Sequence, residues 1–323
     1  MADMDSNDDV VFDHQTLRLI IGALAFAFPT VVIALTGKIT TSISSSYHEP
    51  ETRDVFVGFL FLMGGLLIAY KGHLQGEPWD RTTSVWKWFF SFQWLKVYQE
   101  DIVSAVGGFA GIFAALYPTA RDGFPMDFDA KVHMVGAFIL FSNVVYFCMV
   151  AFLRSLNQKL VADLLLENGI KVTSAAVAQK LKSLKSPPGR SLFQKIIRLP
   201  FAEIDLFFCI VRKAKKYSLG EIEPTTEALD RAWDRFMKLW RGRVYVVCGL
   251  VIIVVLAAYV IIGWRMPDLL TTTKITFIIE TVALVFFGFA WGTASKFDFV
   301  PQLKGWLGYT TKEKTPAAQT QAA

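Results

Sequence analysis

The sequence places one carboxylate, Glu280, inside a long apolar stretch. A charged group within a bilayer is costly, so it needs either a partner or a function. In a structural interpretation, Glu280 pairs with Arg53 or Arg265, or forms hydrogen bonds to neighbouring helices. In a functional interpretation, Glu280 is a proton or ligand site. The sequence leaves both interpretations open. The structural one is favoured, because it requires no bound ligand and no proton transfer.

Further polar side chains are expected on the same side of the membrane as Glu280, Ser44 among them. We predict one ligand-binding or structural polar cluster there, made of Ser45, Tyr47, His48, Arg53, Asp54, His133 and Glu280. His48, His133 and an acid such as Asp54 have the chemistry to hold a zinc ion. Neither His-x-x-x-His nor another fixed metal spacing is present, so the histidines are weak metal candidates. We predict no metal, no other cofactor and no catalytic residue, whereas bound lipid is compatible with the composition.

A second polar set is expected at the cytoplasmic ends of two helices, and it consists of Tyr70, His73 and Asp101. A carboxylate at the start of a helix is favoured by the helix dipole, which explains Asp101 without a function. The sequence contains no Walker loop, GxSxG or HExxH motif, and no GxGxxG after a strand. The sequence therefore assigns no reaction, which favours a protein without enzymatic activity.

Membrane-spanning helices must position these residues, because the apolar residues are gathered in long runs. Hydrophobic residues make up 53% of the chain, against roughly 45–50% in soluble domains even when glycine is counted. Runs of about 18 residues with almost no charge are typical of transmembrane helices. The predicted fold class is an all-α integral membrane protein, a bundle of six transmembrane helices with interfacial amphipathic helices and a cytoplasmic helical loop. The six predicted spans are 19–35, 55–70, 102–118, 132–153, 244–264 and 275–291.

The third predicted span is rich in glycine. It contains Gly107, Gly108 and Gly111, whose spacing includes the small-xxx-small pattern that lets two helix backbones approach closely. We therefore predict that this helix packs tightly against a neighbour.

Two other apolar stretches carry too many charges to be read as spans. The first, 85–98, mixes three Trp and three Phe with Lys87 and Lys96, which is typical of a helix lying in the headgroup plane. The second, 191–213, is interrupted by Pro200. It lies in the headgroup plane as well, or it packs on the cytoplasmic face of the bundle. A re-entrant arrangement is disfavoured for both stretches.

Lysine and arginine near the span ends predict which loops are cytoplasmic. The segment 154–243 carries 18 Lys and Arg against 9 Asp and Glu, and both of its ends are basic. This segment is therefore expected in the cytoplasm, and alternation places both termini there too. The predicted organisation is an acidic tail (1–17), four spans (18–153, with the interfacial helix 85–98), the basic loop (154–243), two spans (244–292) and a second tail (293–323).

The basic loop 154–243 also indicates the kind of partner. Each lysine or arginine near an anionic inner leaflet contributes about 1 kcal/mol of attraction, so membrane lipids are the expected partners. The loop could instead serve only to fix topology, and a protein partner or a homo-oligomer through it is an open alternative. Nucleic acid is not expected, because the basic residues alternate with apolar ones that need a membrane or a bundle to cover them.

Two segments have a distinctive pattern, SISSSYHEPETRDVFVGFLFLMGGLLIAYKGH and DIVSAVGGFAGIFAALYPT. A loop rich in Ser and Tyr precedes an Arg-Asp-x-Phe-Val-Gly helix start, and an Asp-led, glycine-rich helix closes in a proline. This pattern, and the C-terminal pair RGRVYVVCGLVII and FIIETVALVFFGFAW, resembles a group of bacterial six-helix membrane proteins akin to the Frag/DRAM-like family. The resemblance implies six helices and an inner-membrane location, but no specific activity. The matching residues are Ser45, Tyr47, Arg53, Asp54, Gly58, Tyr70, Gly72, Asp101, Gly108 and Pro118.

A more distant similarity is to the seven-helix alkaline-ceramidase-like hydrolases, which use Ser, Asp and His around zinc. The present chain lacks their paired histidine motif and one of their helices. The similarity therefore does not by itself imply hydrolase activity.

Three functions are compatible with these observations. The favoured one is a non-enzymatic lipid-interacting, sensing or assembly subunit. The second is a transporter or channel for a small molecule, lipid or ion that uses Glu280 and Arg53. The third is a zinc-dependent intramembrane lipid hydrolase that uses His48, His133 and Asp54. For all three, the expected location is the cell inner (plasma) membrane, with several passes through it.

Overall fold

A computed structural model describes residues 14–71, 99–121, 124, 126–167, 172–173, 176–177, 179–181, 202–217 and 226–295. Every element of this described part is helical, in agreement with the predicted all-α class. The elements are α1 (His14–Thr36), the 3₁₀ turn η1 (Ser44–His48), α2 (Pro50–Ala69), α5 (Gln99–Leu116), α6 (Phe128–Tyr146), the π turn η2 (Phe147–Ala151), α7 (Phe152–Glu167), α10 (Ala202–Tyr217), α11 (Thr226–Arg265), α12 (Pro267–Thr272) and α13 (Ile275–Ala294).

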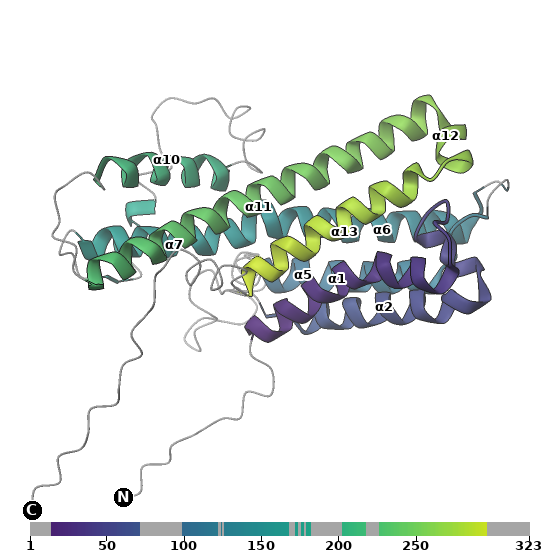
Figure 1. Ribbon diagram of the computed structural model, residues 1–323, viewed down its shortest axis with the longest axis horizontal. Helices are drawn as coiled ribbons and strands as arrows, with labels where there is room; N and C mark the ends of the chain where they lie inside the picture. Colours follow the sequence, from purple (N-terminus) through teal and green to yellow (C-terminus); the bar gives the residue numbers. More distant parts are fainter. Residues whose placement is uncertain are drawn as a thin grey trace, which may run out of the picture.

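The long helices lie side by side and alternate in direction along the chain (Figure 1). One end of the bundle carries η1, α12 and the start of α6, and we call it the η1 end. At the other end, α7, α10 and the first part of α11 extend beyond α1, α2, α5 and α13 (Figure 1). We call this the α10 end. The polar residues of interest gather at these two ends.

Five helices are long and apolar enough to cross a membrane, and they coincide with five of the six predicted spans. The helix over the sixth, α5, packs between α2 and α6. Its first turn carries Glu100 and Asp101, and it is not among the five. The five segments are Gln15–Thr36, Pro50–Ala69, Phe128–Leu166, Asp234–Arg265 and Ile275–Ala294.

Two helical segments are longer than the sequence predicted. The helix over the fourth predicted span continues as α6, η2 and α7, so that Phe128–Leu166 forms one helical path. The helix α11 has 40 residues and is therefore about 60 Å long, twice the roughly 30 Å of a hydrocarbon core. Hydropathy marks only the apolar part of a helix, so both extensions were missed.

Glycines set the closest helix contacts. A Cβ added at Gly64 on α2 would lie 2.6 Å from the carbonyl oxygen of Gly108 on α5, and one added at Gly108 would collide with the Gly64 carbonyl. The predicted close packing of the glycine-rich helix is thus confirmed at Gly108. A similar contact joins α1 to α13, where a Cβ at Gly22 would lie 2.9 Å from the nitrogen of Gly292.

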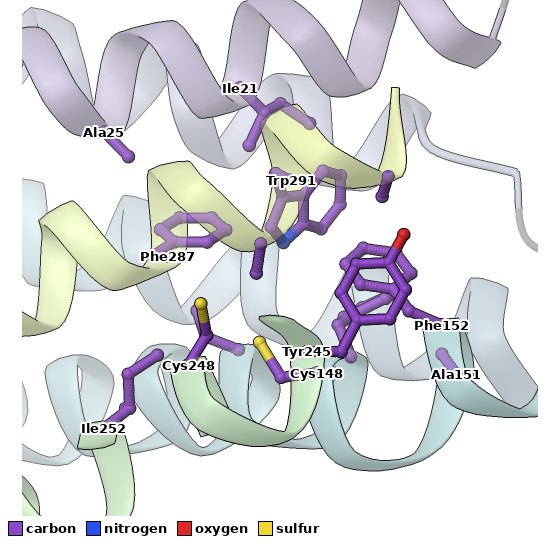
Figure 2. Close-up of a cluster of buried hydrophobic side chains, with 14 of the residues drawn as sticks. Ile21, Ala25, Cys148, Ala151, Phe152, Tyr245, Cys248, Ile252, Phe287 and Trp291 are labelled. Carbon is purple, nitrogen blue, oxygen red and sulfur yellow. The ribbon is translucent and has the colours of Figure 1, made fainter. Parts of the chain in front are cut away.

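Trp291 on α13 lies at the centre of the hydrophobic core, fully buried (Figure 2). The centroid of its ring lies 5.3 Å from that of Tyr70, 5.2 Å from that of Phe147 and 5.5 Å from that of Phe152. The buried thiols of Cys148 and Cys248 point into the same cluster (Figure 2). The core therefore joins α13 to the ends of α2 and α6, to α7 and to α11.

The apolar face of α10 is covered by protein. Its side chains Ile204, Leu206, Phe207 and Ile210 are buried, and the helix contacts α7, η2 and α11. Of the two arrangements considered for 191–213, packing on the end of the bundle is therefore the one observed over 202–213. The predicted interfacial helix 85–98 lies outside the described residues, as do 1–13 and 296–323.

Candidate functional site

Glu280 is bound by the loop that follows α1. Its carboxylate accepts a hydrogen bond from the backbone N–H of Ile43 at 2.5 Å and one from the hydroxyl of Ser44 at 3.0 Å. The N–H of Phe277 also donates to the carbonyl of Thr41 at 3.0 Å. Glu280 thus lies at the start of η1, where backbone N–H groups lack helical partners and an anion is favoured.

Of the two structural alternatives for Glu280, the ion pair with Arg53 or Arg265 is not observed. The guanidinium of Arg53 lies over the ring of Tyr47, 4.8 Å from its centroid, and Arg265 lies 4.8 Å from the ring centroid of Trp264. The hydrogen bonds of Glu280 instead support the other part of the structural interpretation. Its partners come from the loop before η1 because that loop folds back over the start of α13.

His133 is buried beside the same region. Its Nδ1 lies 2.7 Å from the carbonyl oxygen of Ala114 and 3.0 Å from that of Tyr117, so this nitrogen carries a proton that it donates to the end of α5. His133 and Glu280 both line a small cavity of about 50 Å³ whose other walls are mainly apolar. We call it the inner cavity.

A larger cavity of about 650 Å³ opens at the η1 end. We call it the outer pocket. One wall comes from η1 and the start of α2, and the other comes from the connection between α5 and α6. The Nε2 of His48 lies 2.7 Å from the carbonyl oxygen of Thr119 and joins the two walls. The residues with polar or aromatic side chains that line it are Tyr47, His48, Arg53, Thr119, Arg121, Phe124 and Asp127.

The single polar cluster predicted for this side of the membrane is divided in two. Tyr47, His48 and Arg53 line the outer pocket, whereas His133 and Glu280 line the inner cavity. Buried Phe56 separates them. Its ring centroid lies 6.2 Å from that of Tyr47 and 6.2 Å from that of His133.

The remaining two members of the predicted cluster lie elsewhere. The hydroxyl of Ser45 donates to the carbonyl of Ser42 at 2.7 Å and helps to shape the loop. Asp54 is exposed on α2. Within the residues that the structure describes, no group of three His, Cys, Asp or Glu side chains could hold a metal ion. The donors considered for zinc, His48, His133 and Asp54, therefore do not converge.

At the α10 end, Arg18 joins three helices. Its guanidinium donates to the hydroxyl of Tyr70 at 2.7 Å and to the carbonyl of Ala294, the last residue of α13, at 3.3 Å. A cation is favoured there by the dipole of α13. Tyr70 was predicted as a site residue, but Arg18 was not, because an arginine before a first span is typical of a topology signal.

Arg154 lies between two acids at the same end. Its guanidinium is 3.8 Å from the carboxylate of Glu100 on α5 and 3.9 Å from that of Glu203 on α10. Asn157 donates to the carbonyl and to the carboxylate of Glu203, at 3.0 and 3.1 Å. This ion network joins α5, α7 and α10, and no motif in the sequence predicts it. Of the predicted inner residues, Asp101 lies in the first turn of α5, and His73 lies outside the described residues.

The comparisons with known proteins add no relative. A scan against family profiles found no match, and searches of curated proteins and of solved structures found no significant match. The resemblance to the Frag/DRAM-like group therefore stays a prediction.

Proposed function

We propose that this chain is a six-helix protein of the cell inner (plasma) membrane that acts as a non-enzymatic lipid-interacting, sensing or assembly subunit. In this proposal α5 is the sixth span, both termini are cytoplasmic and the η1 end faces outward. The five apolar helices support the membrane location. The position of α5 between α2 and α6 supports its assignment as a span.

The observation that carries the non-enzymatic assignment is how the bundle uses its polar side chains. Glu280 is bound by Ile43 and Ser44, and His133 by Ala114. The hydroxyl of Ser104 donates to the carbonyl of Leu67 at 2.6 Å, which joins α5 to α2. Likewise, the amide of Asn143 on α6 donates to the carbonyl of Val103 on α5. Each of these groups holds one element to another.

The surface of the bundle supports a lipid environment. Large apolar side chains are exposed along α5 and α6, among them Phe109, Phe113, Val135 and Phe138, which are all about half exposed. Soluble monomers rarely expose contiguous apolar patches larger than a few hundred Å². Lipid chains are the cover that such a surface requires in a protein with several apolar spans.

The helices beyond the α10 end support an assembly role. There α10 packs on α7 and α11, within the segment 154–243 that has an excess of lysine and arginine. This segment is the proposed contact for anionic lipids of the inner leaflet, for a protein partner or for a second copy of the chain. No nucleic-acid partner is proposed.

A second candidate function, a transporter or channel, is favoured by one observation. Glu280 and His133 line the same inner cavity, and two titratable groups at one small cavity are a usual feature of proton pathways. In that case the hydrogen bonds of Glu280 would break and re-form during transport.

Single-cysteine labelling of the full chain tests the topology. Cys148, Cys209 and Cys248 are first replaced, and Lys38→Cys, Lys131→Cys and Asp268→Cys are then made one at a time. A membrane-impermeant maleimide should label all three in intact cells. Matched cysteines at Lys71 and Asp234 should be labelled only after permeabilisation. Labelling of Lys71→Cys in intact cells would contradict the proposed orientation.

Reconstitution into phospholipid vesicles tests the function. Native mass spectrometry of the purified protein should show retained phospholipid, and the vesicles should show neither phospholipid hydrolysis nor a proton leak above that of protein-free vesicles. A leak that disappears in Glu280→Gln but persists in Ser44→Ala would replace the proposal with the transporter. Hydrolysis that a chelator stops would replace it with the hydrolase.

A further inference from the structure

We infer that the outer pocket is a binding site for a phosphate-bearing ligand, held by the guanidinium groups of Arg53 and Arg121. The inference assigns a ligand class to a protein that the proposed function describes only as lipid-interacting. It rests on that proposal solely in taking the η1 end to lie at a membrane surface.

The pocket has the size and construction of a ligand site. Its volume of about 650 Å³ lies within the roughly 300–1,000 Å³ of small-molecule sites. Its two walls come from segments far apart in sequence, and the hydrogen bond between His48 and Thr119 holds them together. At the base of the first wall, the hydroxyl of Thr52 donates to the carbonyl of Ser46 at 2.9 Å. The pocket is therefore built on a connected scaffold.

The charges of the pocket select an anion. Arg53 and Arg121 both line it, and within the described residues neither forms an ion pair with a carboxylate. The only partner of Arg53 there is neutral, because its Nη2 donates to the hydroxyl of Tyr47 at 3.2 Å. As far as the described residues go, the remaining donors of both guanidinium groups have no carboxylate partner and can bind an anion.

Asp127, the acid in the lining, has another role. Its Oδ1 accepts a hydrogen bond from the backbone N–H of Ala130 at 2.8 Å and caps α6. A carboxylate at a helix N-terminus is stabilised by the helix dipole. Among the described residues that line the pocket, the two arginines therefore outnumber the one acid, and their charges sum to a positive value.

The two guanidinium groups, and the exposed aromatic side chains at this end of the bundle, favour phosphate over other anions. Two guanidinium groups match the several oxygens of a phosphate, to which arginine binds in a bidentate manner. Phe124 and Phe128, beside the pocket, are 69% and 73% exposed. Exposed aromatic side chains at the end of a membrane bundle are typical of the headgroup level. The same phosphate chemistry is present in a lipid headgroup and in a soluble phosphorylated compound.

The test measures ligand binding to the full-length protein in maltoside micelles. The quantity recorded is the rise in melting temperature as ligand is added. The probes are dihexanoyl phosphatidylglycerol, dihexanoyl phosphatidylcholine, whose phosphate is neutralised by choline, and glycerol 3-phosphate. The parent is compared with the double variant Arg53→Gln and Arg121→Gln. The matched control is Arg265→Gln, because Arg265 is exposed at the same end of the bundle but does not line the pocket.

The double variant should bind the anionic probe weaker by about tenfold or more, as expected for lost charge-assisted hydrogen bonds. Arg265→Gln should bind it within about twofold of the parent, since only a distant, screened charge is lost. Replacing both arginines by lysine should give an intermediate affinity, because the charge is kept and the bidentate geometry is lost. Both pocket arginines are exposed, so the variants should unfold at the parent temperature without ligand.

The probes separate the two sources of phosphate. Binding of phosphatidylglycerol without glycerol 3-phosphate assigns a lipid headgroup, and equal binding of the two assigns a soluble phosphorylated ligand. The inference is overturned if neither anionic probe binds, or if the double variant binds them as the parent does. The measurement does not depend on orientation, so a failed topology test would leave its result unchanged.

Discussion

Glu280 on α13 accepts a 3.0 Å hydrogen bond from the hydroxyl of Ser44, which lies 236 residues earlier in the chain. Together with the hydrogen bond from Ile43, this contact holds the loop between α1 and α2 against α13. The polar group that most suggested chemistry in the sequence thus has a structural role, and its interpretation as a proton or ligand site stays a prediction. Substitutions at Glu280 and at Ser44 distinguish the loss of the whole carboxylate from the loss of one hydrogen bond.

Glu280→Gln should lower the free energy of unfolding by about 1–3 kcal/mol, because each carboxylate oxygen accepts from one donor and the amide NH₂ replaces one of these two acceptors. Ser44→Ala should cost less, since it removes only one of the two bonds and leaves the carboxylate in place. Denaturant unfolding in maltoside micelles measures both. Equal stability of Glu280→Gln and the parent would contradict the assigned partners.

Gly108→Ala should lower the free energy of unfolding by about 1–3 kcal/mol, the usual cost of overpacking. The added methyl group would collide with the carbonyl of Gly64, so α2 and α5 would have to move apart. Gly58→Ala is the matched control, because a Cβ at Gly58 has no neighbour within 4 Å. The control should be neutral or stabilising by up to about 1 kcal/mol from helix propensity. A stabilising effect at both sites would rule out the close contact.

Trp291→Ala should lower the free energy of unfolding by about 3–5 kcal/mol, because it removes the central ring of the core and leaves a cavity. Trp264→Ala serves as the control, since Trp264 is 76% exposed. Near-ultraviolet circular dichroism during thermal unfolding follows both variants. Similar losses for the two tryptophans would contradict the central position of Trp291.

Arg154→Gln should lower the free energy of unfolding by about 3 kcal/mol, because two buried carboxylates lose a shared cation. Adding Glu203→Gln to that variant should restore part of the loss, since one of the two carboxylates that Arg154 contacts is then neutral. Together with Glu203→Gln alone and the parent, these variants form a double-mutant cycle, read by denaturant unfolding. Strictly additive losses would show that Arg154 and Glu203 do not interact.

Hydropathy predicted the helices because lipid solvation acts on each helix separately. Five predicted spans coincide with five apolar helices, and a helix is present over the sixth. Helix lengths beyond the bilayer were not predictable in this way. The extensions of α6 through α7 and of α11 pack against α10, and the pattern of 191–213 suggested such packing without identifying its partners.

The features that the sequence did not predict depend on contacts between segments that are far apart in the chain. The spacing among Gly107, Gly108 and Gly111 indicated a close approach, but the partner of Gly108, Gly64, follows from the arrangement of α2 and α5. The outward polar cluster was predicted as one site because its residues share one end of the bundle. A single buried ring, Phe56, divides it, and residue types alone do not reveal such a barrier. Arg121 was missed because a lone loop arginine has no distinguishing signal.

The uninterrupted length of α11 has a mechanical consequence. One continuous helix runs from the platform that supports α10 to the end that carries the outer pocket. No loop interrupts α11 between Thr226 and Arg265, so a tilt at one end is not taken up by a hinge between helices. A displacement of α10 and α7 is therefore expected to be transmitted along α11 to the η1 end.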